Sequence, residues 1–255
     1  MRTGKAQLNT LVRFCDHLLR TSEIQDWDGA VNGLQVENRG EVTRIAAAVD
    51  ASLVTVGRAI QQGADLLLVH HGLFWSPSHP WTGRRLELIR ALVAGNLAVY
   101  SSHLPLDLHP QLGNNIRLSR ALGLRGGQPF FFQKGRFIGL KFEHAIRREV
   151  LVDRLADVVG GPPILLPGGP KVCRRIGIVT GGAGAELKTA AQEGVDTFIT
   201  GEGPHWTFGL SEDLGVNVLY GGHYATETFG VKALAERLSK KFHVPWSFID
   251  HPSGL

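Results

Sequence analysis

Arg44–Trp75, RIAAAVDASLVTVGRAIQQGADLLLVHHGLFW, aligns without a gap with Arg175–Trp206, RIGIVTGGAGAELKTAAQEGVDTFITGEGPHW. Eight of the 32 aligned pairs are identical, and both copies follow the same pattern of residue types. In each, an apolar run leads to a helix-like stretch, then to Gly-x-Asp, and then to a second apolar run. The repeat predicts two copies of a βαβ-like unit, in which a helix joins two parallel strands.

A histidine with a carboxylate four residues later follows a third apolar run in each copy. The two segments are Ala98-Val-Tyr-Ser-Ser-His103-Leu-Pro-Leu-Asp107 and Val218-Leu-Tyr-Gly-Gly-His223-Tyr-Ala-Thr-Glu227. Imidazole nitrogen and carboxylate oxygen are ligands that hold Zn, Mn and Fe in proteins. A metal-binding half-site duplicated within one chain is the simplest physical reason for this pattern.

The copies diverge after the second apolar run, where the first has His70-His71-Gly72 and the second has Gly201-Glu202-Gly203. Neighbouring residues of a regular strand point to opposite faces. Both imidazoles can therefore serve one site only if the strand has ended, or if each binds a different ion. Alone, the pair is more readily explained as satisfied or surface histidines. Its place at a strand end, equivalent to the ends that carry the two half-sites, favours metal binding.

Glu202 occupies the position of His71 in the second copy, and His205 follows three residues later. One interpretation is a base or proton shuttle beside the metals; the other is a group that orients a metal ligand. The turn Gly181-Gly182-Ala-Gly184 could cradle an anion or serve packing alone. Asp28 and Asn32 lie in a glycine-bearing turn, where local hydrogen bonds are sufficient to explain them.

The composition is that of an ordinary globular protein: 255 residues, 43% hydrophobic and 20% charged. No apolar run approaches the ~20 residues of a membrane span, and the first residues lack the features of a signal peptide. We expect Cys15 and Cys173 to be buried thiols, which fits a cytoplasmic location. The net charge of +4 is spread over scattered arginine pairs, so no basic stripe supports nucleic-acid binding.

Strands alternate with helices, so the expected fold class is α/β, with two similar α/β domains and the metal site between them. We expect a discontinuous first domain, residues 1–123 plus 220–255, and a second domain over residues 124–219. The expected strands are 45–49, 66–69, 98–100, 176–180 and 244–249, and the expected helices are 7–19, 53–62, 85–94, 116–122, 150–159 and 229–238.

Several motifs together resemble those of a known family. They run in order along nearly the whole chain: Asn32-Gly-Leu-Gln-Val, Ala64-Asp-Leu-Leu-Leu-Val-His-His-Gly72, His103-Leu-Pro-Leu-Asp107 with Gly113-Asn-Asn, Thr200-Gly-Glu, and Gly222-His-Tyr-Ala-Thr-Glu227. They are similar to the NIF3 family, also called the dinuclear metal centre hexameric family. Its bacterial members are often labelled GTP cyclohydrolase 1 type 2 homologs.

The resemblance implies two similar α/β domains, toroidal homohexamers and a two-metal site that faces the interior cavity. This chain resembles the short form, without the inserted domain of longer members. Two divalent ions per chain are implied, of Zn, Mn, Fe or Ni. The positions that match the family's metal ligands are His70, His71, His103, Asp107, His223 and Glu227.

Such a site favours a metal-dependent hydrolase acting on a nucleotide-like or phosphate-bearing small molecule. Two ions lower the pKa of bound water and can clamp the attacking and leaving oxygens. Glu202 and His205 are then the candidate catalytic residues for proton transfer. The alternatives are a non-catalytic metal-binding oligomer, acting as a scaffold or in metal handling, and a ring that encircles nucleic acid. No membrane partner is expected.

Overall fold

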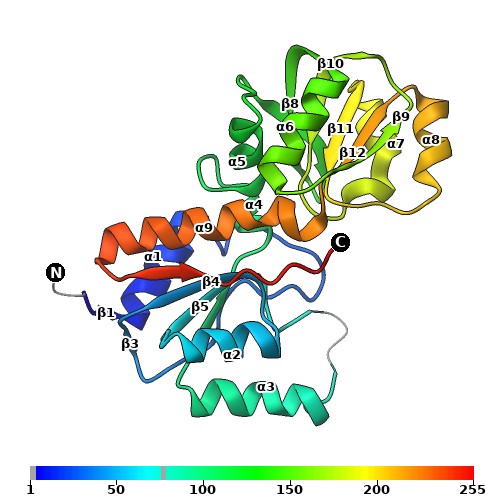
Figure 1. Ribbon diagram of the computed structural model, residues 1–255. Helices are drawn as coiled ribbons and strands as arrows, with labels where there is room; N and C mark the ends of the chain where they lie inside the picture. The colour runs from blue at the N-terminus through cyan, green and yellow to red at the C-terminus, as the bar shows by residue number, and fades with distance from the viewer. Residues whose placement is uncertain (1–3, 76–78) are drawn as a thin grey trace. The chain divides into compact units, whose positions relative to one another are not determined.

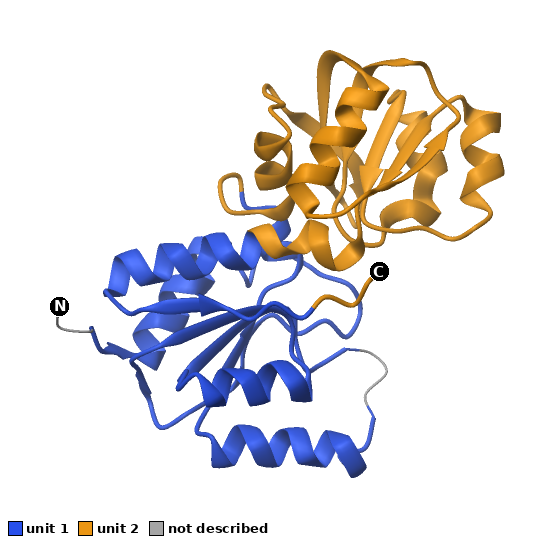
Figure 2. Ribbon diagram, viewed as in Figure 1, with its two compact units in different colours: residues 1–109, 230–251 blue, residues 110–229, 252–255 orange. Residues whose placement is uncertain are grey.

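The computed structural model describes residues 4–75 and 79–255 (Figure 1). Contacts divide the chain into two compact units (Figure 2). Unit 1 contains residues 1–109 and 230–251, and unit 2 contains residues 110–229 and 252–255. Among the described residues, no helix combines the length and apolar character needed to cross a membrane.

Unit 1 is built on a five-stranded sheet that is parallel except for one edge strand. Its strands lie in the order β13 (Trp246–Phe248), β4 (Ile45–Asp50), β5 (Leu66–His71), β6 (Ala98–Ser101) and β2 (Gly33–Val36), with β2 antiparallel to β6. A small sheet pairs β1 (Ala6–Gln7) with β3 (Glu41–Val42). The helices are α1 (Leu8–Leu19), α2 (Leu53–Gln61), α3 (Gly83–Ala94), the short α4 (Leu104–Asp107) and part of α9 (His223–Phe242).

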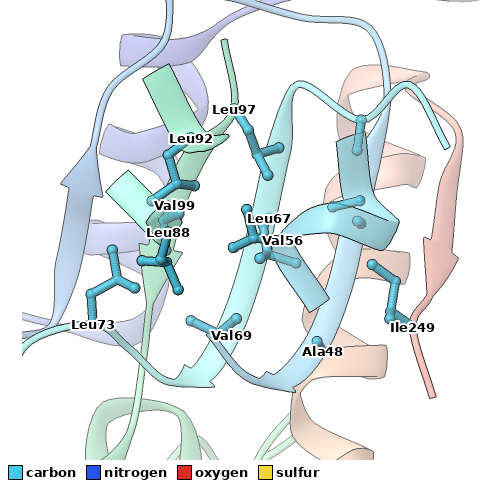
Figure 3. Close-up of a cluster of buried hydrophobic side chains, with 13 residues drawn as sticks. Ala48, Val56, Leu67, Val69, Leu73, Leu88, Leu92, Leu97, Val99 and Ile249 are labelled. Atoms are coloured by element: carbon cyan, nitrogen blue, oxygen red, sulfur yellow. The ribbon is translucent and has the colours of Figure 1, made fainter. Parts of the chain in front are cut away.

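The apolar core of unit 1 lies between this sheet and the helices α2 and α3 (Figures 1 and 3). Leu67, Val69 and Val99 of the strands are buried in it. They pack with Val56 of α2 and Leu92 of α3, which are also almost fully buried. Helices α1 and α9 cover the opposite face (Figure 1). Burial on both faces explains why the central strands are continuous apolar runs.

Unit 2 has a six-stranded mixed sheet. Its strands lie in the order β7 (Gln128–Gln133), β8 (Arg136–Arg147), β10 (Val172–Ile178), β11 (Thr197–Thr200), β12 (Asn217–Tyr220) and β9 (Ile164–Pro167). The strands β10, β11 and β12 are parallel, and the others run antiparallel to their neighbours. The helices are α5 (Asn114–Ala121), α6 (Arg148–Val159), the 3₁₀ helix η1 (Ala183–Glu186), α7 (Leu187–Gln192), α8 (Thr207–Leu214) and the first turns of α9.

The internal duplication is visible in the strand order. The sequence β4-β5-β6-β2 in unit 1 corresponds to β10-β11-β12-β9 in unit 2, including the antiparallel edge strand. Asp65 and Asp196, equivalent in the alignment, make matching contacts. The carboxylate of Asp65 accepts from the N–H groups of Thr43 and Arg44, and that of Asp196 from those of Arg174 and Arg175. The predicted α/β fold with two similar halves is confirmed.

The domain boundaries differ from the expected residues 123/124 and 219/220. Leu118 and Leu122, expected in the first domain, belong to the core cluster around Phe142 of unit 2. The chain leaves unit 1 after His109, and its later boundary falls inside α9, between Phe229 and Gly230. Side-chain packing, which composition along the chain does not report, sets these limits.

Two elements extend beyond their expected limits, and both extensions include candidate ligands. Strand β5 continues through His71 rather than ending at Val69, because Asp50 of β4 still pairs with His71. Helix α9 begins at His223 rather than Phe229. His223 and Glu227 therefore lie one helical turn apart, at positions that face the same side.

Asp65 and Asp196 should each stabilise their own unit. We expect Asp65→Ala and Asp196→Ala to lower the free energy of unfolding by about 1–3 kcal/mol each, because main-chain N–H groups lose their acceptor. Urea denaturation followed by circular dichroism measures the effect. Asp157→Ala, at an exposed position of α6, is the matched control and should change stability by less than ~0.5 kcal/mol. Equal stability of all three variants would contradict the proposed role.

Candidate metal centre

Three histidines of unit 1 converge at the carboxyl ends of β5 and β6. The ring centroids of His70 and His71 are 4.8 Å apart, those of His70 and His103 also 4.8 Å, and those of His71 and His103 5.7 Å. Each ring offers a nitrogen, and these ligand atoms lie within 4.8 Å of one another. The sequence places His70, His71 and His103 at strand ends, and the structure brings them into one cluster. It does so although His70 and His71 are consecutive in a strand.

Each of these histidines is oriented through its Nδ1 atom. The Nδ1 of His70 lies 3.0 Å from the main-chain oxygen of Ser102, and the Nδ1 of His71 lies 2.8 Å from Oδ1 of Asp50. The Nδ1 of His103 lies 2.8 Å from Oδ1 of Asp26. A carbonyl or carboxylate oxygen can only accept, so Nδ1 carries the proton and Nε2 presents its lone pair. This is the arrangement found behind metal-ligating histidines.

Asp26 is the most heavily bonded of the orienting groups. Its side chain is 4% exposed and also accepts from the side chain of Asn32 and the N–H groups of Trp27 and Leu104. Burial opposes its charge, but hydrogen bonds from His103, Asn32 and Trp27 outweigh that and lower the pKa of Asp26. Asp26 therefore stays a carboxylate and can hold the proton on His103 Nδ1.

Asn32 also forms a hydrogen bond with a residue far from its own turn in the sequence. Its Oδ1 accepts from the main-chain N–H of His103 at 2.7 Å, so local turn bonding is not its whole role. Asp26 and Asp50 were not singled out from sequence. Their signal was slight, because their histidine partners are 77 and 21 residues away. The sequence draws attention to this loop only through the motif Asn32-Gly-Leu-Gln-Val and the glycine-bearing turn of Asp28 and Asn32.

Asp107 completes the polar cluster of unit 1. It lies on α4, is nearly buried, and places Oδ2 3.5 Å from Nε2 of His70. Trp75 closes another side, with its ring edge-on to His71 and His103 at centroid distances of 5.7 and 5.1 Å. Unit 1 therefore presents three imidazole nitrogens and one carboxylate beside an aromatic wall.

Unit 2 carries a second group of donors around His223. Its Nδ1 lies 2.7 Å from Oε1 of Glu202, and its Nε2 lies 3.2 Å from Oε2 of Glu227, which is 3% exposed on the next turn of α9. Burial disfavours a charged ring, but the carboxylates of Glu227 and Glu202 outweigh this and raise the pKa of His223 to about 9. A cation that binds at Nε2 would displace this proton.

The glycine turn after β10 packs against these donors. Gly181 has a φ of +76°, and a Cβ there would collide with the carboxylate of Glu227. Gly182 lies close to the ring of His223. The packing interpretation of this turn therefore has direct structural support: glycine lets the main chain approach a buried carboxylate.

Glu202 and His205 occupy different settings. Glu202 orients His223, as the second interpretation of this residue expected, while its side chain is 43% exposed. His205 lies in the exposed loop between β11 and α8, and its ring forms no hydrogen bond or ion pair with the described residues. A proton-transfer role for either residue stays a prediction.

The donors fit a transition metal of the Zn, Mn, Fe or Ni type. Imidazole nitrogen and carboxylate oxygen suit all of these. The histidines of unit 1 are held in the tautomer that coordination requires, and Glu202 fixes Nδ1 of His223 in unit 2. The fold and these donors define an α/β protein with a histidine and carboxylate cluster compatible with metal binding.

Comparison with known proteins identifies the family. The family model described as Duf34/NIF3 (NGG1p interacting factor 3) matches residues 6–253, so the chain belongs to this family. The GTP cyclohydrolase 1 type 2 homolog of Deinococcus radiodurans is 40% identical, with 100% of this chain and 97% of that protein covered. The Pyrococcus abyssi protein of the same name is 39% identical, over 96% of this chain and 98% of its own length.

A solved structure is also similar to this chain over nearly its whole length. The crystal structure of TTHA1606 from Thermus thermophilus has a TM-score of 0.90 and 39% sequence identity, and the match covers 98% of this chain and 100% of that one. Recognition of the NIF3 family from sequence motifs is therefore confirmed.

Removing an orienting carboxylate should weaken metal binding without removing a ligand. We expect Asp26→Asn to lower the affinity for Zn²⁺ by about 10- to 100-fold, because the amide cannot hold the proton on His103 Nδ1 in the same way. Competition with a chromogenic chelator measures the affinity. Glu87→Gln, on the exposed side of α3, should leave it unchanged. An Asp26→Asn protein with the original affinity would rule out this orienting role.

Proposed function

We propose that the chain is a two-metal hydrolase whose dinuclear centre takes ligands from both half-sites. The observation that carries the proposal is the set of four histidines with Nδ1 fixed by an acceptor. Their Nε2 atoms are thereby prepared for cations. His70, His71, His103 and Asp107 would supply ligands from unit 1, and His223 and Glu227 from unit 2. The equivalence of the two segments in the internal repeat supports a shared centre.

The ions, when bound, would lower the pKa of a coordinated water and stabilise negative charge on the reacting oxygens. The protein's own groups have simpler tasks. Asp26, Asp50 and Glu202 hold protons on Nδ1 of His103, His71 and His223. In the proposal Glu202, which is partly exposed, also exchanges a proton with the substrate, and His205 is a second candidate for this transfer.

A nucleotide-like or phosphate-bearing small molecule is the proposed substrate. Support comes from the relatives, which are named GTP cyclohydrolase 1 type 2 homolog. The choice of hydrolysis rests on the site chemistry, since clustered nitrogen and carboxylate donors are the usual setting of metal-activated water.

Metal content tests the centre directly. We expect about two ions per chain by mass spectrometry of untagged protein purified without chelator and without added metal. Glu227→Gln should lose at least one ion per chain, and with it the metal-dependent hydrolysis of nucleoside triphosphates. Glu212→Gln, at an exposed position of α8, is the matched control. Metal retained in full by Glu227→Gln would refute the ligand assignment; metal without hydrolysis would favour a metal-handling protein or scaffold.

We also propose a cytoplasmic homohexamer. The family resemblance supports the toroidal hexamer, and the free, buried thiols of Cys15 and Cys173 support a reducing compartment. Native mass spectrometry should therefore give six times the chain mass of 27.7 kDa. A monomer or dimer at micromolar concentration would refute the hexamer, whatever the metal content.

A further inference from the structure

Unit 2 contains a pocket that the ligand assignment does not use. Its volume is about 400 Å³, within the range of about 300–1,000 Å³ common for small-molecule sites. It lies at the carboxyl ends of β11 and β12, beside the first turn of α9, and all its lining residues belong to unit 2. Ligands of open α/β sheets gather at this kind of strand end.

The walls of the pocket are apolar and rich in glycine. Ile164, Tyr220 and Tyr224 supply side-chain surface, and the hydroxyl of Tyr220 is already bonded to Thr207. Glycines 160, 161, 201, 203, 221 and 222 also line it, and a Cβ added at Gly160 or Gly161 would meet no heavy atom within 4 Å. A flat ring can approach the main chain of Gly160 and Gly161 closely because no Cβ intervenes.

The side chains of the lining disfavour a phosphate. Glu202 supplies the only charged side chain among the described residues that line the pocket, and it is negative. No lysine, arginine or histidine of the described lining could stabilise an anion. A phosphate there would be repelled by Glu202 and would lose its hydration without a compensating cation.

Glu202 also connects the pocket to the metal-binding half-site. Its Oε1 accepts from Nδ1 of His223, while Oε2 has no hydrogen-bond partner among the described residues. One carboxylate thus borders the pocket on one side and orients a candidate metal ligand on the other. The free acceptor suits an N–H or O–H group of a bound molecule.

We propose that this pocket holds the uncharged ring of the substrate, with a ring N–H or O–H donating to Oε2 of Glu202. Phosphate groups of the same molecule lie outside the pocket. This inference rests on the proposed hydrolase function, because it states which part of the substrate of that hydrolase lies beside the metals. It separates recognition of the ring from any recognition of phosphate.

Two substitutions should fill the pocket without disturbing the fold. Gly161 has no positive φ, and a Cβ there would meet no heavy atom within 4 Å, so leucine has room. Ala225 lines the pocket from the first turn of α9, where leucine is also tolerated by a helix. Gly209 in α8 has the same free space and φ range as Gly161 but does not line the pocket, so Gly209→Leu is the matched control.

The probe is N-phenyl-1-naphthylamine, an uncharged ring compound with one N–H that fluoresces in apolar surroundings. We expect saturable binding to the as-purified full chain, weakened at least tenfold in both Gly161→Leu and Ala225→Leu and unchanged in Gly209→Leu. Indole should displace the probe about tenfold better than N-methylindole, and inorganic phosphate should not displace it. Melting temperatures of the variants check that they are folded.

Three results would overturn the proposal. They are unchanged probe affinity in both filled variants, equal weakening in Gly209→Leu, and no saturable binding at all, as when another copy of the chain covers the pocket. Metal content is measured on the same samples. Probe binding that obeys the expectation in protein that binds no metal would leave the pocket standing while the hydrolase proposal fails. Metal-dependent hydrolysis together with unchanged probe binding in the filled variants would leave the hydrolase proposal standing while the pocket proposal fails.

Discussion

The parallel register of three strands in each unit is the constraint on which both half-sites depend. Asp65 holds the main chain just before β4, and Asp196 holds Arg174 and Arg175 of β10, just before the parallel pairing with β11 begins at Ile176. Each aspartate also links that segment to the following strand through its own N–H. With the strand starts fixed together, the strand ends reach the same edge of the sheet. His70, His71 and His103 meet there because the ladder places β5 beside β6.

Each of the strand-end histidines has a hydrogen-bond acceptor for its Nδ1 atom, which fixes the orientation of the ring. The side chain of Asp26 is almost completely buried, yet it accepts several hydrogen bonds that keep its pKa low. A buried carboxylate is stabilised only when its oxygens are satisfied in this way. Its contacts with Asn32 and Leu104 tie the loop before β2 to the turn after β6, so the orienting group is itself held rigidly.

The two copies of the repeat share one fold but carry different functional side chains at their strand ends. Where the first copy places two histidines, the second has Gly201-Glu202-Gly203, which leaves a single orienting carboxylate and open space around it. Glycine at position 181 similarly makes room for Glu227. The first unit is therefore rich in nitrogen donors, while the second combines a His–Glu pair with an apolar pocket.

The sequence by itself determined the α/β class, the internal duplication and the family, because hydrophobic periodicity and the order of motifs are local properties of the chain. It also identified the strand-end histidines, since the residue after an apolar run is visible without coordinates. Only the tertiary structure decided that Asp26, Asp50 and Asn32 support those histidines, that α9 begins at His223, and that core packing moves the unit boundaries to His109 and Phe229. These features arise from hydrogen bonds and packing between residues far apart in the chain, and such pairings leave no local pattern to read.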